Sequence, residues 1–561
     1  MMTNSFADIR TVRASSVPIA AALCRLAKIA QTVNQMVHWR EANSKVSPGL
    51  LIETLVICIL CGRKPLWKIE QFWAQQDLRT LFADVELSVE QLNDDAYGHA
   101  LDKLAEVSMK ELVSTVSLSL LQAHSLGIHI AHFDTTSKSV QGAYTGEAHD
   151  EFKIDHGFSK DLRPDLKQFK LGAAVQEDGL VIMGELLAGN KTDVEWNPEA
   201  AVEMQKLFTQ QGLKDVIFVA DCALISTGGL KELAEQNVQF ISRFPETFGL
   251  AKELKELAWE QDAWQDIGIL AESKGSQAAR YKVFPAHRKI DDREYSFLVV
   301  HSSVLEASKE KTLVKRISKQ KEELARKAKT LTSAAFACEP DAQNALQAFA
   351  LEIAKLGFSF SGSVTCQTVL TYAHKGRPKK GEQPMETISY RIECEIGDLA
   401  PERFERLRQM ESTFVLIYSI QDKENYTPKA VLTEYKRQIS IETKFRFLKN
   451  PVYLGPVFLK SQKRIHALGY VFILVLMLAS YLEYRVRKSL KEKNEFVQLP
   501  GNKKTDTPSV MTILEVLATI EVVVVQGQRY FPSNINRQAL DMVRWAGFDP
   551  SIYLKSAGSI Q

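Results

Sequence analysis

Two aspartates and one glutamate in the sequence have the chemistry of a divalent metal site. Asp134 ends the alternating segment 127–134 and Asp221 ends the apolar segment 215–221, so each carboxylate lies at the end of a predicted strand. Glu442 lies on a segment with helical periodicity. Carboxylate oxygens are hard ligands of the kind that Mg2+ and Mn2+ prefer. If a fold gathers all three, they could hold metal ions that activate water for cleavage of a phosphodiester bond.

The helical segment around Glu442 carries further polar side chains on the same face. Seven residues bring a helix back to within about 20° of its starting direction, so Tyr435, Glu442 and Lys449 point the same way, with Gln438 and Arg446 beside them. A carboxylate flanked by cations and a phenol suits a site for metal and phosphate. The face that can pack on a sheet carries Ile439, Phe445 and Leu448. An ordinary solvated, charged helix is the alternative for this segment taken alone.

The elements that would position the two aspartates form an α/β pattern. Strands are predicted at 127–134, 169–176, 180–188, 215–221 and 238–244, and helices at about 197–211 and 227–236. The turn Glu177-Asp178-Gly179 joins the second and third strands as a hairpin. This order of elements is shared by the ribonuclease-H-like nucleic-acid enzymes. In that topology Asp134 and Asp221, which are 87 residues apart, end neighbouring central strands.

The composition is that of a large globular protein of the cytosol. Of 561 residues, 45% are hydrophobic and 25% are charged, which excludes disordered and collagen-like classes. Seven cysteines, an odd number, argue against a disulfide framework and for a reducing compartment. Residues 1–16 contain no apolar stretch typical of a secretory signal. Because the net charge is only +2, any surface for a polyanion must be local.

One apolar segment, 467–482, raises the alternative of a membrane-anchored protein. A spanning helix needs about 20 apolar residues, and this segment is shorter and has basic residues on both sides, which give no orientation signal. We therefore expect a fully buried core helix and no membrane contact.

The chain is predicted to contain five regions. They are a helical N-terminal domain (1–125), the first part of the core (126–248), a large mixed α/β insertion (249–430), the second part of the core with the Glu-bearing helix (431–490) and a helical C-terminal tail (491–561). In the N-terminal domain, helices are predicted from Pro48 to Gly62, from Pro65 and from Asn93. Helix, basic turn and helix is an outline of DNA-binding domains that small helical domains of other functions share. The tail begins with a predicted linker at 491–507.

The insertion carries a local concentration of positive charge. The predicted helix 309–329 has nine basic against three acidic residues, including Lys315, Arg316 and Lys319. This excess in a near-neutral chain favours a surface that faces phosphates, and a solvated helix is the alternative. Arg377, in the sequence KGRPKK, resembles the core of a minor-groove AT-hook, and a basic hairpin tip is the alternative there. The apolar face of the helix carries Leu313, Ile317, Leu324 and Leu331.

Together these residues resemble the DDE transposases of bacterial insertion sequences, in the insertion-sequence-4-like superfamily. The pattern of that superfamily is Tyr-x2-Arg-x3-Glu-x6-Lys, and the chain has Tyr435-x2-Gln438-x3-Glu442-x6-Lys449. Gln438 departs from the pattern, because it replaces a cation expected to contact DNA phosphate. The segments similar to the branch of insertion sequence 1634 are 92–95 (LNDD), 132–137 (HFDTTS), 156–168 (HGFSKDLRPDLKQ), 219–221 (VAD) and 240–243 (FISR).

The resemblance implies a fold, an activity and a set of partners. The fold is a ribonuclease-H-like core interrupted by a large insertion, with two Mg2+ (or Mn2+) ions held by Asp134, Asp221 and Glu442. The activity is cleavage of element ends and joining of the freed 3′-OH to target DNA, by a homodimer on paired terminal inverted repeats in the bacterial cytoplasm, at the nucleoid. A non-transposing nuclease on the same core and a catalytically inactive DNA-binding derivative are the alternatives. DNA contacts are expected from Tyr435, Gln438, Lys449, Lys315, Arg316, Lys319 and Arg377.

Overall fold

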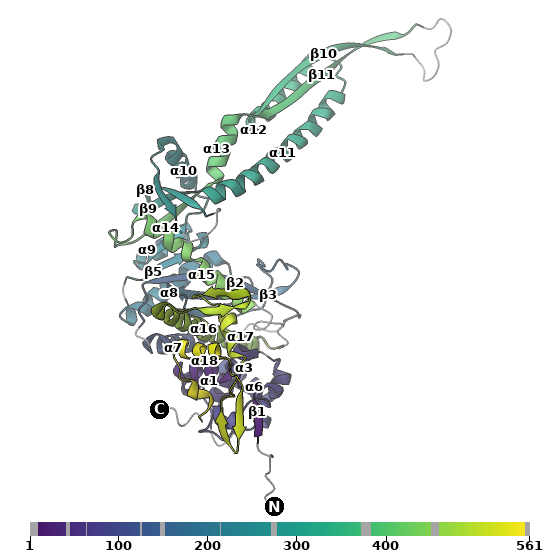
Figure 1. The fold of residues 1–561 in the computed structure, drawn as a ribbon. Coiled ribbons are helices and arrows are strands. Elements are labelled where there is room, and N and C mark those ends of the chain that lie inside the picture. Colours follow the sequence, from purple (N-terminus) through teal and green to yellow (C-terminus); the bar gives the residue numbers. More distant parts are fainter. Residues whose placement is uncertain are drawn as a thin grey trace, which may run out of the picture. The chain divides into compact units, whose positions relative to one another are not determined.

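The chain divides into two compact units (Figure 1). The core unit comprises Met1–Ser242 and Ser419–Gln561, and the inserted unit comprises Arg243–Tyr418. The computed structural model describes residues 9–40, 45–62, 64–123, 126–145, 152–213, 215–270, 278–371, 383–449 and 459–555.

The core unit contains a mixed sheet in which the strands follow the order β4-β3-β2-β5-β6. Its strands are β2 (Ile130–Val140), β3 (Lys167–Gln176), β4 (Val181–Leu187), β5 (Ile217–Ala220) and β6 (Gln239–Arg243). β2, β3 and β4 are antiparallel neighbours, whereas β5 runs parallel to both β2 and β6. The five predicted strands are confirmed, as is the hairpin turn, in which Gly179 adopts a positive φ of 84°.

β2 is longer than the sequence predicts. The predicted strand ends at Asp134, but β2 continues to Val140, because it pairs with β3 from Ala131 onward. Its parallel pairing with β5 covers only Ile130–His132. Asp134 therefore lies inside a strand, just beyond the point where β2 and β5 separate.

Two helices follow the hairpin and connect the parallel strands. α9 (Thr227–Glu235) begins and ends within a residue of its predicted bounds. α8 (Asp193–Gln210) begins earlier than predicted, because Thr192 and Glu195 form a capping box at its N-terminus. The prediction that this helix begins at Asn197-Pro198 was wrong, since Pro198 lies inside the helix. The earlier start brings Asp193 into the first turn.

Helix α16 (Gln462–Lys493) is the centre of the core unit. Every residue from Ile465 to Tyr484 is buried, and the helix contacts β4 and helices from both the N-terminal and the C-terminal segments of the chain. By length and composition this helix could cross a membrane, but its most apolar stretch is entirely buried by other parts of the chain. The predicted buried core helix is confirmed.

The N-terminal and C-terminal segments belong to this same unit. The N-terminal helices include α1 (Val17–Leu26), α2 (Ile29–Met36), α3 (Pro48–Gly62), α4 (Ile69–Trp73), α6 (Asp94–Leu104) and α7 (Met109–Gln122). The predicted start at Pro65 is a short 3-10 turn (Leu66–Lys68) before α4, whereas Asn93 caps α6 as expected.

The C-terminal tail is less helical than predicted. The predicted linker contains the paired strands β13 (Val497–Leu499) and β14 (Lys503–Thr505). After α17 (Val510–Leu517), strand β15 (Val522–Val525) pairs with β1 (Ile9–Val12) and with β16 (Gln528–Tyr530). The tail ends with α18 (Arg537–Trp545) and a short 3-10 turn. Strand pairing thus joins the two ends of the chain.

The inserted unit combines a sheet with a long hairpin on two helices (Figure 1). The sheet pairs β7 (Gln265–Ile269), β8 (Arg280–Ile290), β9 (Arg293–Ser302) and β12 (Thr413–Ser419) in antiparallel fashion. The hairpin of β10 (Phe358–Thr371) and β11 (Met385–Leu399) packs on α11 (Ser303–Ser333) and α12 (Glu339–Leu356). α10 (Gly249–Gln261) and α13 (Pro401–Glu411) complete the unit.

The predicted basic helix is confirmed as part of α11. Its expected apolar face packs as predicted: Leu313 and Leu324 are buried, and Ile317 and Leu331 pack against the cluster around Leu324. The helix is longer than predicted because Ser302 caps it at its N-terminus, before the charged region begins.

A buried ion pair attaches α15 (Ile439–Lys449) to α16, and its loss should destabilise the core. Glu483 lies 2.6 Å from Lys444 of α15 and 2.9 Å from Arg487, and it accepts a hydrogen bond from the Val510 amide. Glu483→Gln keeps the shape but leaves Lys444 buried without a counter-charge, so we expect a loss of about 3–5 kcal/mol. Urea unfolding measures this loss.

The matched control for that variant is Glu106→Gln, which removes an exposed ion pair with Lys463. Exposed pairs contribute less than about 1 kcal/mol. Equal losses for Glu483→Gln and Glu106→Gln would contradict a stabilising role for the buried pair.

Candidate functional site

The pairing of β2 with β5 brings Asp134 next to Asp221. The parallel register joins Ile130 to Ile217 and His132 to Val219. Two residues further in the same register, Asp134 lies opposite Asp221, at the point where the two strands separate. The sequence predicted this juxtaposition from the order of the strands alone.

Asp221 is fixed by hydrogen bonds at the end of β5. Its carboxylate caps a short 3-10 turn by accepting from the Ala223 amide at 3.0 Å, and it also accepts from Asn197 Nδ2 at 3.1 Å. Its main-chain oxygen accepts from Ser242 Oγ of β6. The side chain is therefore held in one orientation by groups from α8 and its own turn, while Ser242 of β6 holds the Asp221 backbone.

A lysine lies between Asp134 and a third aspartate. Lys160 Nζ is 3.4 Å from Asp134 Oδ1 and 3.2 Å from Asp193 Oδ2, and it donates to the Thr135 main-chain oxygen at 2.7 Å. Asp193 also accepts from Thr135 Oγ1 and from the buried Lys170. Sequence reasoning gave no role to Lys160 or Asp193; the signal for Lys160 was its place in the segment 156–168.

The pKa values at this site reflect burial of several charges together. Burial, opposed by the charge of Lys160 and assisted by that of Asp221, raises the pKa of Asp134 to about 6. Burial also raises the pKa of Asp221. The pKa of Asp193 is lowered despite its burial, because Thr135 and two lysines favour its charged form. For the same reason the carboxylates raise the pKa of Lys160 despite its burial. Asp134 is thus the carboxylate that is least satisfied in its charged form.

The helix expected to carry Glu442 is divided into two. α14 (Pro428–Arg437) and α15 (Ile439–Lys449) are separated at Gln438, where the hydrogen bonds to Tyr435 and from Ile441 span three residues instead of four. The shared face of Tyr435, Glu442 and Lys449 was predicted for a continuous helix, so the break changes its geometry.

Glu442 itself is exposed on α15. α15 packs on β2, β3 and α16, but Glu442 makes no hydrogen bond or ion pair with any described residue. Across the described ranges, no group of three His, Cys, Asp or Glu side chains is placed to hold a metal ion. The structure therefore brings Asp134 and Asp221 together without the third predicted carboxylate.

The packed face of α15 also differs from the prediction. Ile439, expected to pack on the sheet, is 62% exposed, whereas Phe445 is buried as expected. The rotation of α15 is set by the break at Gln438 and by the Lys444–Glu483 ion pair. A uniform helical periodicity could not reveal either of them. The side chain of Leu448 lies outside the described residues. Among the side chains of α15 that the structure describes, the buried ones are Ile441, Lys444, Phe445 and Phe447.

Lys449 connects α15 to the loop that carries Lys160. Its Nζ lies 2.7 Å from Asp161 Oδ1, and Asp161 also accepts from the Ser139 amide of β2. The neighbouring Lys160 contacts Asp134, so two consecutive loop residues link α15 to the aspartate site. Tyr435 and Gln438 are half-buried at the break.

The basic residues of α11 lie in the inserted unit. Lys315, Arg316 and Lys319 are exposed, and Arg316 forms an ion pair with Glu411 at 2.5 Å. Arg377 lies outside the described residues, so its predicted role in DNA binding has no structural description. Elsewhere on α11, Lys321 and Lys327 are paired with acidic residues of the same unit.

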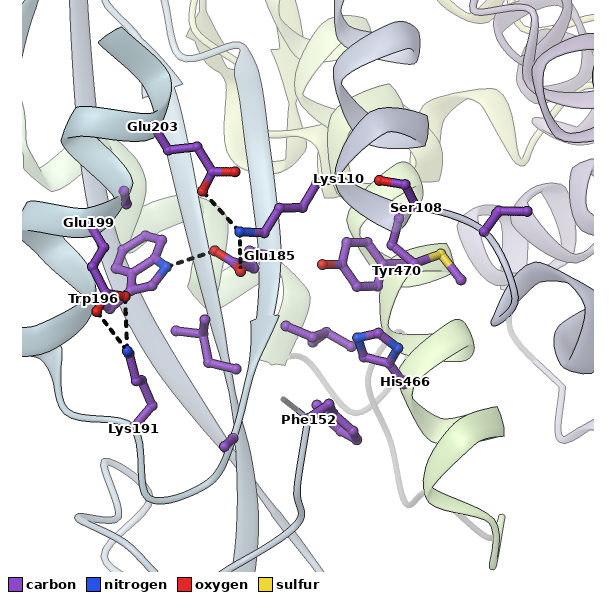
Figure 2. Close-up of a pocket in the computed structure, with 16 residues that line it drawn as sticks. Ser108, Lys110, Phe152, Glu185, Lys191, Trp196, Glu199, Glu203, His466 and Tyr470 are labelled. Atoms are coloured by element: carbon purple, nitrogen blue, oxygen red, sulfur yellow. Dashed lines mark hydrogen bonds and ion pairs between the residues drawn. The ribbon is translucent and has the colours of Figure 1, made fainter. Parts of the chain in front are cut away.

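A separate hollow of about 470 Å³ in the core unit was not predicted from the sequence (Figure 2). Its wall carries Lys110, which forms ion pairs with Glu185 and Glu203, and Trp196, whose indole donates to Glu185. Figure 2 shows Tyr470 lining the same hollow, from α16. Lys110 is already neutralised by carboxylates within the wall.

Asp134→Asn should stabilise the metal-free protein at neutral pH. Folding raises the pKa of Asp134 from 3.8 to about 6, so the folded state favours the protonated carboxyl. The stabilisation from this protonated carboxyl is complete below pH 3.8 and is lost as the pH rises through 6. The charged form then costs on the order of 1–3 kcal/mol at pH 7.5, a cost that Asn removes. Thermal unfolding in chelating buffer should show a higher Tm for the variant at pH 7.5 and no gain at pH 4. A lower Tm at pH 7.5 would contradict this account of Asp134.

Comparisons with known proteins give one family match and several structural likenesses. Residues 9–118 match a family described as a domain of unknown function, DUF4277. No curated protein matches the chain. A cryo-EM structure of a piggyBac transposase synaptic complex with hairpin DNA is 9% identical, with 90% of this chain and 79% of that chain covered and a TM-score of 0.36. A Mos1 transposase paired-end complex with the left transposon end is 14% identical, with 32% of this chain and 60% of that chain covered and a TM-score of 0.14.

Proposed function

We propose that the chain is a DNA transposase that cuts the ends of an insertion sequence and joins the freed 3′-OH to target DNA. The observation that carries the proposal is the position of Asp134 and Asp221, which lie together where the parallel strands β2 and β5 separate. The strand order β4-β3-β2-β5-β6 supports a ribonuclease-H-like core. The pattern Tyr435-x2-Gln438-x3-Glu442-x6-Lys449 on the neighbouring helices supports the transposase assignment.

Divalent ions fit the aspartate pair in part. Asp134 and Asp221 offer carboxylate oxygens, and the ammonium of Lys160 already lies at Asp134, so this place accommodates positive charge. Bound Mg2+ or Mn2+ would supply activation of water and stabilisation of the leaving 3′ oxygen. Asp134, Asp221 and Glu442 are the residues proposed to hold two ions, which for Glu442 requires α15 to bring its side chain closer to the aspartates.

The other residues of the site are proposed to bind and orient DNA. Lys449 would exchange Asp161 for a phosphate, because both are oxygen anions and the lysine is only partly buried. The substrate is proposed to be double-stranded DNA with terminal inverted repeats, bound by a homodimer on paired ends. Further contacts are assigned to Tyr435, Gln438, Lys315, Arg316, Lys319 and Arg377.

The experiment that tests this function uses the purified full-length chain and a linear duplex with the inverted repeats that flank the reading frame. In Mg2+ we expect strand cleavage at the repeat ends, a 3′-OH product, and joining of that product to a target plasmid. Cleavage without joining would replace the transposase with a non-transposing nuclease. Specific binding without cleavage would contradict any catalytic function.

A catalytically inactive DNA-binding derivative is the second candidate. Two observations favour it: Gln438 stands where the pattern has a cation, and Glu442 is not gathered with the aspartates. The cleavage assay separates the two candidates, because only the enzyme cuts DNA, and it requires a divalent ion to do so.

Neutralising the exposed lysines of α11 should weaken DNA binding. Each phosphate contact contributes about 0.9 to the slope of log affinity against log salt concentration. The double variant Lys315→Gln/Lys319→Gln should therefore bind the duplex more weakly, with a slope smaller by about 2. Titrations at several salt concentrations measure the slope. Lys321→Gln is the matched control, because Lys321 is paired with Asp398, and an unchanged slope in the double variant would make α11 an ordinary solvated helix.

A further inference from the structure

The loop that brings Lys160 to Asp134 exposes two large apolar side chains. Phe158 is 80% exposed and Leu162 is 87% exposed, and they lie two residues before and after Lys160. Consecutive Cα atoms are about 3.8 Å apart, so both residues lie within about 8 Å of the Lys160 Cα along the chain. The Lys160 side chain itself reaches Asp134. One base step along a DNA strand is about 3.4 Å long. The exposed pair therefore lies within a few base steps of the point at which Asp134 would hold a DNA strand.

The backbone of this loop is held in place although its apolar side chains are exposed. The Phe158 main-chain oxygen accepts from Gln168 Nε2 at 3.1 Å, and the Lys160 amide donates to Ser137 Oγ of β2 at 2.9 Å. Asp161 accepts from Ser139, the next outward residue of the same strand. Side chains from two strands thus fix the loop on both sides of Lys160. Because the loop is anchored, the exposure of its apolar side chains is a property of the fold.

Leu162 adopts a backbone conformation that is unfavourable for leucine. Its φ is 57°, in the left-handed region that γ-branched side chains rarely occupy. A turn stabilises it: the Leu162 amide donates to the Ser159 oxygen, and the Arg163 amide donates to Ser159 Oγ. Strain of this kind is typical of functional sites. An asparagine would fit this backbone better, so an exposed leucine here points to a use for its apolar surface.

We propose that Phe158 and Leu162 form an apolar wedge that unstacks the base pairs next to the phosphate cut at the aspartate site. Phe and Leu are among the side chains that proteins insert between base steps, and an aromatic ring offers a surface on which an unstacked base can lie. The charges beside the pair belong to the proposed catalytic site, which favours DNA over a second protein as the partner. The inference rests on the proposed function and adds a contact to bases, whereas the aspartate site acts on the backbone.

The test measures base unstacking directly. The probe is a duplex that carries the flanking inverted repeat, with 2-aminopurine at the positions next to the cut. Saturating wild-type chain in Ca2+, which is used here to restrict cleavage, should raise the fluorescence several-fold. Phe158→Ala and Leu162→Asn should each reduce this rise by more than half, and the double variant should abolish it. Asn suits the left-handed backbone, so Leu162→Asn removes the apolar surface and keeps the turn.

Leu351→Ala is the matched control, because Leu351 is an exposed leucine of the inserted unit at 57%. A second measurement uses a duplex mismatched beside the cut, on which the variants should regain cleavage to within a few-fold of wild type, since the bases are already unpaired. Three results would each overturn the wedge. The variants could show the wild-type rise in fluorescence, the mismatch could fail to restore their cleavage, or sedimentation could show that the substitutions change only dimer formation. If wild type cuts the duplex without unstacking it, only the wedge is wrong; if wild type neither binds nor cuts, the proposed function fails and the wedge fails with it.

Discussion

Asp134→Asn and Asp221→Asn should each lower the rate of cleavage at the element end by at least about 1,000-fold. Each substitution removes an oxygen anion that is proposed to place the metal ions, and loss of an interaction needed in the transition state lowers the rate of the chemical step. Binding of the duplex should stay within a few-fold of wild type, because the proposed phosphate contacts are made by basic residues spread over the chain. Single-turnover cleavage in Mg2+ with saturating protein measures the chemical step separately from binding.

The control for these two variants is Asp165→Asn, on the loop that carries Lys160. Asp165 is exposed and paired with Arg163, so its neutralisation should leave cleavage nearly unchanged. A cleavage rate within tenfold of wild type for either Asp134→Asn or Asp221→Asn would remove that residue from the metal site.

Glu442→Gln should have an effect of similar size, with cleavage lower by orders of magnitude and binding retained. The substitution keeps the shape of the side chain and removes its charge, and in the proposed mechanism placement of both ions depends on three carboxylates. Because Glu442 is exposed on α15, the variant should unfold at the wild-type temperature. Cleavage and thermal unfolding measured on the same preparation separate a catalytic effect from a loss of folding.

Glu434→Gln serves as the comparison, since Glu434 is the acidic residue of α14 and lies next to Arg437. It forms an ion pair with Arg437 at 2.7 Å, and burial raises its pKa. If Glu442→Gln cleaves at nearly the wild-type rate while Glu434→Gln does not, the third carboxylate has been assigned to the wrong residue.

The aspartate pair could be predicted from the sequence because it depends on local patterns. Asp134 and Asp221 each come at the end of a segment whose pattern predicts a strand, and the order of strands and helices places those two strands side by side. Lys160 and Asp193 could not be predicted in the same way, since their contacts depend on where a loop and a helix start fall in space. The capping box at Thr192, which sets Asp193 in the first turn, was hidden by the stronger start signal of Pro198.

The orientation of Glu442 is set by interactions that leave no local signal. The break at Gln438 contains neither glycine nor proline, and the rotation of α15 depends on the pair of Lys444 with Glu483, 39 residues away. The pairing partner of strand β15 likewise could not be predicted from local sequence. Its four valines indicate a strand, but its partner β1 lies at the other end of the chain.

Iron-directed cleavage of the protein chain tests most directly whether Asp134, Asp221 and Glu442 form one metal site when the DNA end is bound, as we propose. Fe2+ that replaces Mg2+ generates radicals that cut the backbone beside the bound ion. With ascorbate, peroxide and the inverted-repeat duplex, we expect fragments that end near residues 134, 221 and 442, that are suppressed by excess Mg2+ and that are absent in Asp134→Asn. Without DNA, the cut near 442 should weaken, because Glu442 is not gathered with the aspartates in the free chain. Cuts confined to other segments, or cuts at these positions that Mg2+ does not suppress, would contradict the account.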